Sequence, residues 1–205
     1  MKIIRQEDLN LEEIVSGLKN GHTLVYPTET CYGLGCDATN AIAVARLFAI
    51  KERQLDKSML LLMADTSMGR EYVRWNPVLD TLAQRYWPGP LTVVAALRTD
   101  VELPAGVIGK ERTVAFRVTS HPLATALARQ LGRPLVSTSA NIAAHDSPYD
   151  IASVLQMFAN AREQPDIVID AGALTHHNPS TIVRLRGEKL DVLRQGEIVV
   201  DHLNI

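Results

Sequence analysis

The segment KERQLDK, from Lys51 to Lys57, concentrates positive charge between two apolar stretches of the chain. Arginine offers phosphate a planar fork of donors and lysine offers a point charge, so Lys51, Arg53 and Lys57 could together bind a polyphosphate. A single lysine there would be explained better by the preference of helix C-termini for cations. Three cations at the end of a buried helix favour the phosphate interpretation.

A second candidate is Arg117, within the strand-like segment TVAFRV. The two-residue period of a strand places both valines and Phe116 on one face and Arg117, beside Ala115, on the other. At an exposed edge this arginine would carry little meaning, whereas on a buried sheet face it requires an anionic partner. The carboxylate of a ligand would meet that requirement.

Hydroxyl groups gather in two further segments. STSAN, from Ser137 to Asn141, follows the apolar end of a strand, and open α/β sheets bind ligands at the carboxyl ends of their strands. PTETCYGLG, from Pro27 to Gly35, combines threonines with glycines that let a ligand approach the backbone, although on its own it is typical of an ordinary turn. Ser180 and Arg194 each border a later strand and would close the same cleft only if the fold brings them there.

Several chemistries are disfavoured by the sequence. It contains no G-x-S-x-G, no H-E-x-x-H and no Walker lysine motif, so neither a nucleophilic triad nor a zinc hydrolase is expected. Cys31 and Cys36 have the spacing of neither a redox pair nor a common metal knuckle, and we interpret both thiols as packing groups. No protein-bound metal site is predicted.

Composition bounds the class of protein. The chain has 205 residues, of which 46% are hydrophobic and 21% charged, with a formal net charge of −2. This composition is that of an ordinary globular protein, and the length favours one domain over residues 1–205. Two cysteines suggest a reducing compartment, charged residues interrupt any signal peptide, and no apolar stretch approaches the ~20 residues of a membrane helix. We therefore expect a cytoplasmic protein with no membrane segment.

The elements that must position these groups follow from caps and periodicity. Helices are expected at residues 11–20, 41–50, 77–87 and 121–131, the last capped by Ser120, and from Asp150 to about residue 160. Strands are expected at residues 22–26, 59–64, 91–97, 113–118, 135–138, 167–170, 181–185 and 191–194, with a loop at residues 27–37. Because some strands are joined by helices and others directly, the predicted fold class is α/β, a single-domain twisted mixed sheet covered by helices.

Taken together, these segments resemble the YrdC family of threonylcarbamoyl-AMP synthases, in particular its short bacterial, TsaC-like form. The resemblance is carried by PTETCYGLG, KERQLDK, WPGPLT (Trp87 to Thr92), FRVTSHP (Phe116 to Pro122) and PLVSTSAN (Pro134 to Asn141). It extends through STIV and LRQG as far as Gly196. Any one motif would be weak, whereas the combination in this order is specific.

The resemblance implies a YrdC-like domain with a concave basic cleft. It implies the synthesis of L-threonylcarbamoyladenylate and pyrophosphate from ATP, L-threonine and bicarbonate, with Mg²⁺ accompanying ATP, as a step in the threonylcarbamoyladenosine modification of tRNA. Downstream threonylcarbamoyl transferase proteins would then act on the product. The chain departs from the family pattern at Gln54, at Ala143-Ala144 and at Tyr149, which bears on the shape of the adenosine side.

Carried over position by position, the resemblance implies roles for individual side chains. Those that would contact threonine or its carbamate are Thr30, Arg117, Ser139 and Ser180. Those that would face the nucleotide are Lys51, Arg53, Lys57, Thr113, Asn141, Tyr149 and Arg194. Lys51 and Arg53 would act in catalysis by offsetting the charge of the triphosphate and of the leaving pyrophosphate.

Two alternatives stay open. A YrdC-like paralogue could keep this fold with weak activity or with a different carbamoyl adenylate as its product. A binding module could instead hold tRNA or double-stranded RNA in the cleft without catalysis. The net charge of −2 argues against the large phosphate-binding surface that this second alternative needs.

Overall fold

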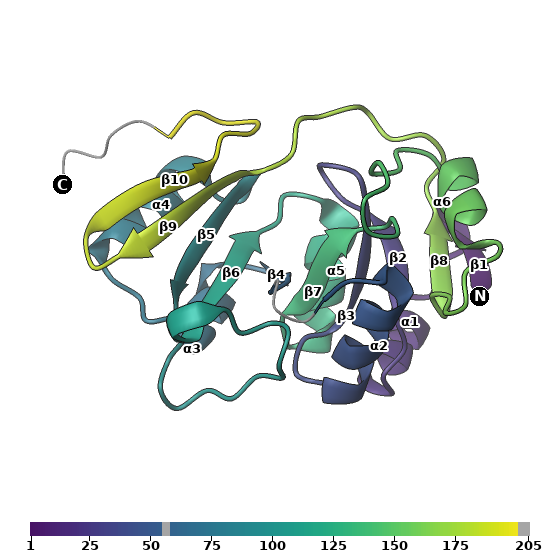
Figure 1. Ribbon diagram of the computed structural model, residues 1–205, viewed down its shortest axis with the longest axis horizontal. Helices are drawn as coiled ribbons and strands as arrows, with labels where there is room; N and C mark the ends of the chain where they lie inside the picture. The colour runs from purple at the N-terminus through teal and green to yellow at the C-terminus, as the bar shows by residue number, and fades with distance from the viewer. Residues whose placement is uncertain (55–57, 201–205) are drawn as a thin grey trace.

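Within the described residues, a mixed sheet of ten strands runs along the molecule (Figure 1). The structure is a computed structural model that describes residues 1–54 and 58–200, so Lys57 lies outside the described residues. The strands are β1 (Lys2–Arg5), β2 (Leu24–Pro27), β3 (Tyr32–Asp37), β4 (Leu60–Met63), β5 (Leu91–Ala96), β6 (Thr113–Val118), β7 (Leu135–Ser139), β8 (Ile167–Asp170), β9 (Thr181–Arg186) and β10 (Lys189–Arg194). Their order across the sheet is β1-β8-β2-β3-β7-β4-β6-β5-β9-β10. Parallel pairs such as β4 with β6 stand beside antiparallel pairs such as β4 with β7, which confirms the predicted mixed sheet.

Side-chain caps set where most helices begin. The helices are α1 (Leu11–Lys19), α2 (Ala41–Lys51), α3 (Thr66–Tyr72), α4 (Pro77–Tyr86), α5 (Pro122–Leu131) and α6 (Ile151–Phe158), with single 3-10 turns at η1 (Gln6–Asp8) and η2 (Lys110–Arg112). The side chains that accept a hydrogen bond from a first-turn N–H are those of Asn10, Asn40, Asp65, Asn76 and Asp150. These short polar groups satisfy donors that a helix start otherwise leaves unpaired, so the cap-based predictions for α1, α4 and α6 are confirmed.

The predicted cap of α5 is wrong. The helix begins at Pro122, and the residue before it is His121, whose side chain makes no capping hydrogen bond. Proline at the first helical position lacks an N–H, so one of the donors that a cap would satisfy is already absent. Ser120 therefore lies one residue too far upstream to cap the helix, whereas Gly132 ends it with a φ of 69°, as predicted.

Residues 32–37, predicted as part of a loop, form the buried strand β3. Glycine is a poor strand former, and Gly33 and Gly35 concealed this strand in the sequence. Gly35 is required by packing, since a Cβ there would lie 2.2 Å from the carbonyl oxygen of Val136 in β7. Neither β1, a short edge strand, nor the seven-residue helix α3 was predicted.

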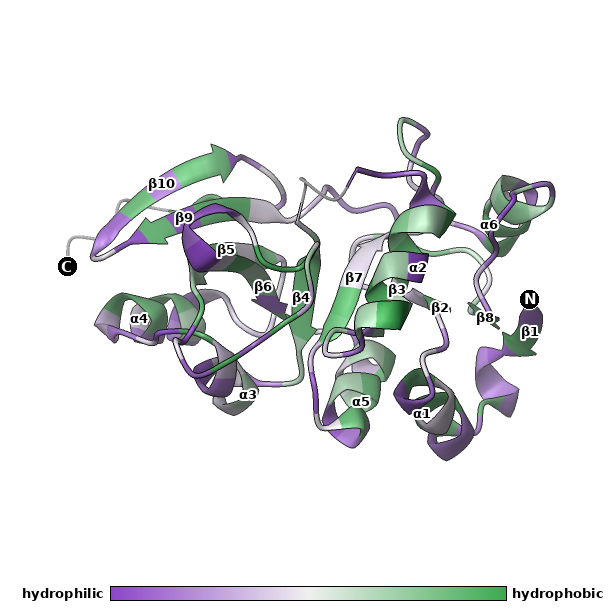
Figure 2. Cartoon of the chain, turned by 60° about the horizontal axis from the view of Figure 1, so that its bottom comes forward, coloured by the Kyte–Doolittle hydropathy of each residue, from purple (hydrophilic) through white to green (hydrophobic). Residues whose placement is uncertain are grey.

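Two apolar clusters cover the two faces of the sheet. One joins α1 and α5, which lie side by side below the strands in Figure 2, to sheet residues that include Tyr26 and Leu62. The other includes residues of α2 and α4 together with Phe116. The predicted alternation of β6 is confirmed, because Phe116 lies in this second cluster while Arg117 pairs with Leu62 on the face of α1 and α5.

Candidate active site

A cavity opens on the α1 and α5 face of the sheet, beside the apolar cluster of those helices. Its volume is about 340 Å³, within the range of roughly 300–1,000 Å³ typical of small-molecule sites. Its floor comes from six neighbouring strands, β3, β7, β4, β6, β5 and β9. The floor residues are Gly33, Leu60, Thr92, Ala115, Arg117, Ser137, Ser139 and Ile182, and the strand register places all of them on one face. The two-residue period of the strands thus decides which side chains reach the cavity.

This position differs from the predicted one at the carboxyl ends of strands. β4 and β7 are antiparallel, so Leu60 at the start of β4 pairs with Ser137 in the middle of β7, and the rest of β7 runs past the start of β4. A mixed sheet has no single carboxyl edge where all strands end. The cavity therefore lies over the face of the sheet, and the STSAN segment meets the beginning of β4 rather than the end of a parallel neighbour.

The walls of the cavity are basic and rich in hydroxyl groups. None of the described lining residues is a carboxylate. The predicted site residues that the fold brings together here are Thr30, Arg53, Arg117, Ser139, Tyr149, Ser180 and Arg194. A cavity lined by arginines without compensating acids concentrates anionic ligands.

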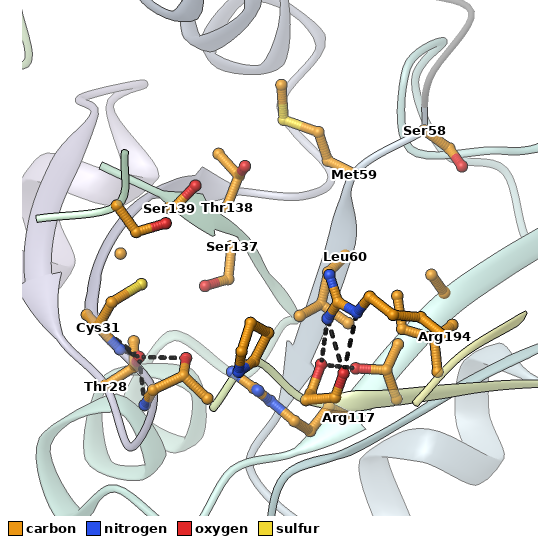
Figure 3. A pocket seen from close by; sticks show the side chains of 18 of the residues that line it. Thr28, Cys31, Ser58, Met59, Leu60, Arg117, Ser137, Thr138, Ser139 and Arg194 are labelled. Atoms are coloured by element: carbon orange, nitrogen blue, oxygen red, sulfur yellow. Dashed lines mark hydrogen bonds between the residues drawn. The ribbon is translucent and has the colours of Figure 1, made fainter. Parts of the chain in front are cut away.

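Arg117 occupies the floor with almost no exposure to solvent. The residue is 3% exposed, and within the described residues none of its nitrogens donates a hydrogen bond. Its contact with opposite charge is a 3.4 Å approach between its Nε atom and Oε1 of Glu29. Figure 3 shows Arg117 between the side of Thr28 and Cys31 and the side of Arg194. A buried guanidinium with so few partners requires an anion, as its position on the buried face predicted.

A tight turn in the PTETCYGLG segment presents Thr30 to the cavity. The Thr28 hydroxyl donates to the carbonyl oxygen of Cys31 at 2.6 Å and accepts from the backbone N–H of Thr30 at 3.2 Å. Gly33 leaves room for this turn, since a Cβ there would lie 3.0 Å from Cγ2 of Thr28. This turn also carries Cys31, which lines the cavity.

The interpretation of the cysteines as packing groups holds for Cys36, which lies in the core, but not for Cys31. Burial raises the pKa of the Cys31 thiol, so the thiol stays protonated at neutral pH.

On the opposite side, Arg194 holds Ser180 in place. Its Nε atom and one terminal nitrogen donate to the carbonyl oxygen of Ser180 at 3.2 and 2.7 Å, as the dashed lines in Figure 3 mark. The Ser180 hydroxyl also lies 2.9 Å from that of Thr92. Burial lowers the pKa of Arg194, and the charge of Arg117 lowers it further. The two arginines therefore add their positive charges in one cavity.

Lys51 and Asn141 lie behind the cavity wall and do not line it. The ammonium group of Lys51 donates to the carbonyl oxygens of Ser139 and Asn141 at 2.6 and 2.8 Å, and to Oδ1 of Asn141 at 2.9 Å. Its three donors are thus all used within the protein, and the structure leaves none directed at a phosphate. Burial lowers the pKa of Lys51 to about 8, with a further contribution from the charge of Arg53.

The remaining predicted nucleotide residues fall into two groups. Arg53 and Tyr149 line the cavity, and the Tyr149 ring stacks on His176 with a centroid distance of 3.5 Å while its hydroxyl donates to the carbonyl oxygen of His177. Thr113, at the start of β6, is not among the lining residues, and its hydroxyl donates to the carbonyl oxygen of Lys110 at 2.8 Å.

Sequence reasoning missed Glu29 and Thr92. Glu29 stands between two threonines in PTET, and a lone acid in a segment otherwise suited to anion binding was the available signal. Thr92 ends the WPGPLT motif and, as a hydroxyl within an apolar strand, also offered a signal.

The described part of the chain offers no cluster of three or more histidine, cysteine, aspartate or glutamate side chains able to hold a metal ion. In the same residues, no helix is long and apolar enough to cross a membrane.

The chain is similar in sequence to known proteins of one family. Residues 16–196 match the model of the Sua5, YciO and YrdC proteins, described as "Telomere recombination". The threonylcarbamoyl-AMP synthase of Vibrio vulnificus is 37% identical over 190 residues, which cover 91% of this chain and 98% of that protein. The threonylcarbamoyl-AMP synthase of Thiobacillus denitrificans is 42% identical over 181 residues, which cover 84% and 89%.

Solved structures show the same architecture. P. abyssi Sua5 complexed with L-threonine matches with a TM-score of 0.84 and 29% identity, over 95% of this chain and 57% of that one. E. coli YciO matches with a TM-score of 0.79 and 25% identity, over 95% and 94%. The chain thus spans nearly the full length of the Vibrio relative and a little more than half of P. abyssi Sua5.

Proposed function

The chain belongs to the Sua5/YciO/YrdC family, and from this premise we propose that it is a threonylcarbamoyl-AMP synthase. It would join ATP, L-threonine and bicarbonate into L-threonylcarbamoyladenylate and release pyrophosphate, as a step toward threonylcarbamoyladenosine in tRNA. Full-length similarity to synthases of bacteria and the shared fold with a threonine-binding Sua5 support this proposal. Family membership confirms the resemblance predicted from the motifs.

The single observation that carries the proposal is the state of Arg117. Its guanidinium lines the cavity, is nearly inaccessible to solvent and lacks a hydrogen-bonded acceptor among the described residues. An amino-acid carboxylate complements this guanidinium in charge, because a guanidinium and a carboxylate form two parallel hydrogen bonds. The hydroxyls of Thr30 and Ser139 line the same space and would orient the amine and carbamate.

The proposed mechanism is positioning combined with electrostatic stabilisation. The threonine amine would form a bond to the carbon of bicarbonate while the bond from that carbon to its hydroxyl oxygen breaks, giving a carbamate and water. With CO₂ one C=O π bond would open instead, and the amine would release one proton to solvent. A carbamate oxygen would then attack the α-phosphorus of ATP, and the bond from that phosphorus to the pyrophosphate oxygen would break. Arg53 and Arg194, which line the cavity, supply positive charge for the leaving group. No described lining residue is a carboxylate or a histidine, so we assign no general base.

Mg²⁺ would enter with ATP and not through a site of the protein. The ion prefers carboxylate, phosphate and water oxygens, and the described lining residues include no carboxylate. The residues present therefore do not fit a resident metal, and we derive no step through it. We extend the proposal to downstream threonylcarbamoyl transferase proteins, which would consume the adenylate, and to a cytoplasmic location. Contact with tRNA or double-stranded RNA is not required by the proposed reaction and stays with the alternative of an RNA-binding module.

The test is pyrophosphate release from ATP in bicarbonate buffer, with the adenylate identified by mass spectrometry. We expect release to require L-threonine and to be much weaker with L-serine. Release that requires carbamoyl phosphate would instead favour a paralogue with another carbamoyl adenylate as product. A protein that released no pyrophosphate with threonine but bound RNA would refute the proposal.

A further inference from the structure

Glu29 lies outside the lining of the candidate threonine site and contacts it through Arg117, and the sequence motifs assign it no role. We propose that it is a positioning residue for amino-acid recognition, which holds the Nε edge of Arg117 so that the terminal nitrogens face the substrate carboxylate. This inference rests on the proposed function, because it concerns how the same cavity selects an amino acid.

Glu29 is itself held firmly from behind. Its side chain is 13% exposed, and its Oε2 atom accepts a hydrogen bond from the Thr119 hydroxyl at 2.8 Å. The same hydroxyl oxygen accepts from the backbone N–H of His121 at 3.2 Å, and the Thr125 hydroxyl donates to the carbonyl oxygen of Thr119 at 3.1 Å. The first turn of α5 thus anchors Thr119, and Thr119 anchors Glu29.

Glu29 contacts Arg117 only at the Nε edge of its guanidinium, within the described residues. The nearest atoms are Oε1 of Glu29 and Nε of Arg117, 3.4 Å apart, and neither has a hydrogen-bond partner in the described part of the chain. A guanidinium is planar, so fixing its Nε edge also fixes the direction of its two terminal nitrogens. Those nitrogens are the pair that binds a carboxylate in bidentate fashion. The contact with Glu29 leaves them available to a ligand.

The position of Glu29 argues for action through Arg117. Glu29 is not among the residues that line the cavity, so it does not touch a substrate there. A buried carboxylate with one unpaired oxygen costs folding free energy, so this arrangement is a poor device for stability alone. The contact between Glu29 and Arg117 is therefore explained better by the orientation of a substrate-binding arginine than by a contribution to folding stability.

The main test is the variant Glu29→Gln, which keeps the shape of the side chain and removes its charge. We expect the KM for threonine to rise at least about tenfold, because a misdirected Arg117 would weaken its charge-assisted hydrogen bonds to the substrate carboxylate, with the KM for ATP changed less than about twofold. The exposed Glu188→Gln in the β9–β10 turn is the matched control and should behave as the native protein. An unchanged KM for threonine in Glu29→Gln would overturn the inference.

Threoninol, which lacks the carboxylate, separates positioning from a general structural effect. The native protein should bind threonine better than threoninol, and Glu29→Gln should reduce this preference while leaving the affinity for threoninol unchanged. Equal losses for both ligands would mean that Glu29 only supports the local structure and would contradict the proposal.

A double-mutant cycle tests whether Glu29 acts through Arg117. In the Arg117→Lys background, which has no Nε edge, Glu29→Gln should lower kcat/KM for threonine by less than about twofold, because the two residues act as one unit. Additive losses would refute the coupling. If Glu29→Gln does not fold, Thr119→Val removes the anchoring hydroxyl and carries the same expectations. Failure of the native protein to release pyrophosphate with threonine would instead reject the proposed function, so the two failures are distinguishable.

Discussion

The Nζ atom of Lys51, at the end of α2, lies 2.9 Å from Oδ1 of Asn141, in the loop that follows β7. The same ammonium group holds the carbonyl oxygens of Ser139 and Asn141. Asn141 in turn accepts a hydrogen bond from the Ser139 hydroxyl and donates one to the carbonyl oxygen of His145. Lys51, Ser139 and Asn141 therefore form one hydrogen-bonded unit that joins the end of α2 to the end of β7.

Replacement of Lys51 by methionine should affect both substrates. The change removes three hydrogen bonds of the Lys51 ammonium group, although Oδ1 of Asn141 still accepts from the Ser139 hydroxyl and the Ser139 carbonyl oxygen from the Asn141 N–H. We expect the free energy of unfolding to fall by about 1–3 kcal/mol. Ser139 lines the cavity, and its loss of support should raise the KM for threonine as well as that for ATP. Denaturant unfolding and steady-state kinetics measure the two effects. A loss confined to ATP would show that Lys51 contacts phosphate directly.

The same lysine predicts a pH dependence. Burial lowers the pKa of Lys51 from 10.5 to about 8 in the folded protein, so above pH 8 the neutral amine has two donors for three oxygens. Affinity for a non-hydrolysable ATP analogue, measured by calorimetry, should fall as the pH rises through about 8. The Lys51→Met variant should not show this fall in affinity.

Stability should change in the opposite direction. Between pH 8 and 10.5 the unfolded chain retains the Lys51 proton that the folded protein has released, so the free energy of unfolding of the native protein should rise relative to that of Lys51→Met. A difference between the two proteins that stays constant from pH 7 to 10 would contradict the lowered pKa.

Arg117→Ala should separate the two substrates. Loss of one member of a buried charged pair costs about 2–5 kcal/mol of binding free energy. We expect the affinity for threonine to fall by this amount and the affinity for ATP to change little. Titration calorimetry with each ligand measures this. Arg85→Ala, an exposed substitution on α4, serves as the control. Unchanged affinity for threonine would exclude the carboxylate role of Arg117.

Gly196 does not line the cavity, but Gly196→Ala should displace the backbone of Ser180, which does. A Cβ at this position would lie 2.1 Å from the carbonyl oxygen of Pro179 and 2.6 Å from the backbone of Ser180, so the backbone must move. We expect a loss of about 1–3 kcal/mol in stability together with a raised KM for threonine. Gly132→Ala adds a Cβ that meets nothing within 4 Å but strains a φ of 69°. It should cost about 1–2 kcal/mol and leave the KM unchanged.

Tyr149 offers a test of the nucleotide side. Tyr149→Phe keeps the ring that stacks on His176 and loses the hydrogen bond to His177, whereas Tyr149→Ala loses both. If the ring forms part of the ATP site, the KM for ATP should rise several-fold in the alanine variant and by less than about twofold in the phenylalanine variant. Native kinetics in Tyr149→Ala would remove this residue from the site.

The sequence by itself determined the local features of this protein. Asn10, Asn76 and Asp150 marked helix starts because capping uses neighbouring backbone groups, and the alternation in β6 placed Arg117 opposite Phe116 because strand period is a local property. The motifs also identified the family. These inferences needed only residues a few positions apart.

Only the tertiary structure decided which polar groups meet. It directed Lys51 to oxygens about ninety residues away, brought Glu29 to Arg117, turned residues 32–37 into a strand beside β7 and placed the cavity over a sheet face. The use of a lysine as phosphate ligand or as anchor depends on the oxygens that surround its ammonium group. Those oxygens come from segments far away in the sequence. The role of Lys51 could not be predicted from its neighbours, because a buried charge is paired with whichever groups the fold packs against it.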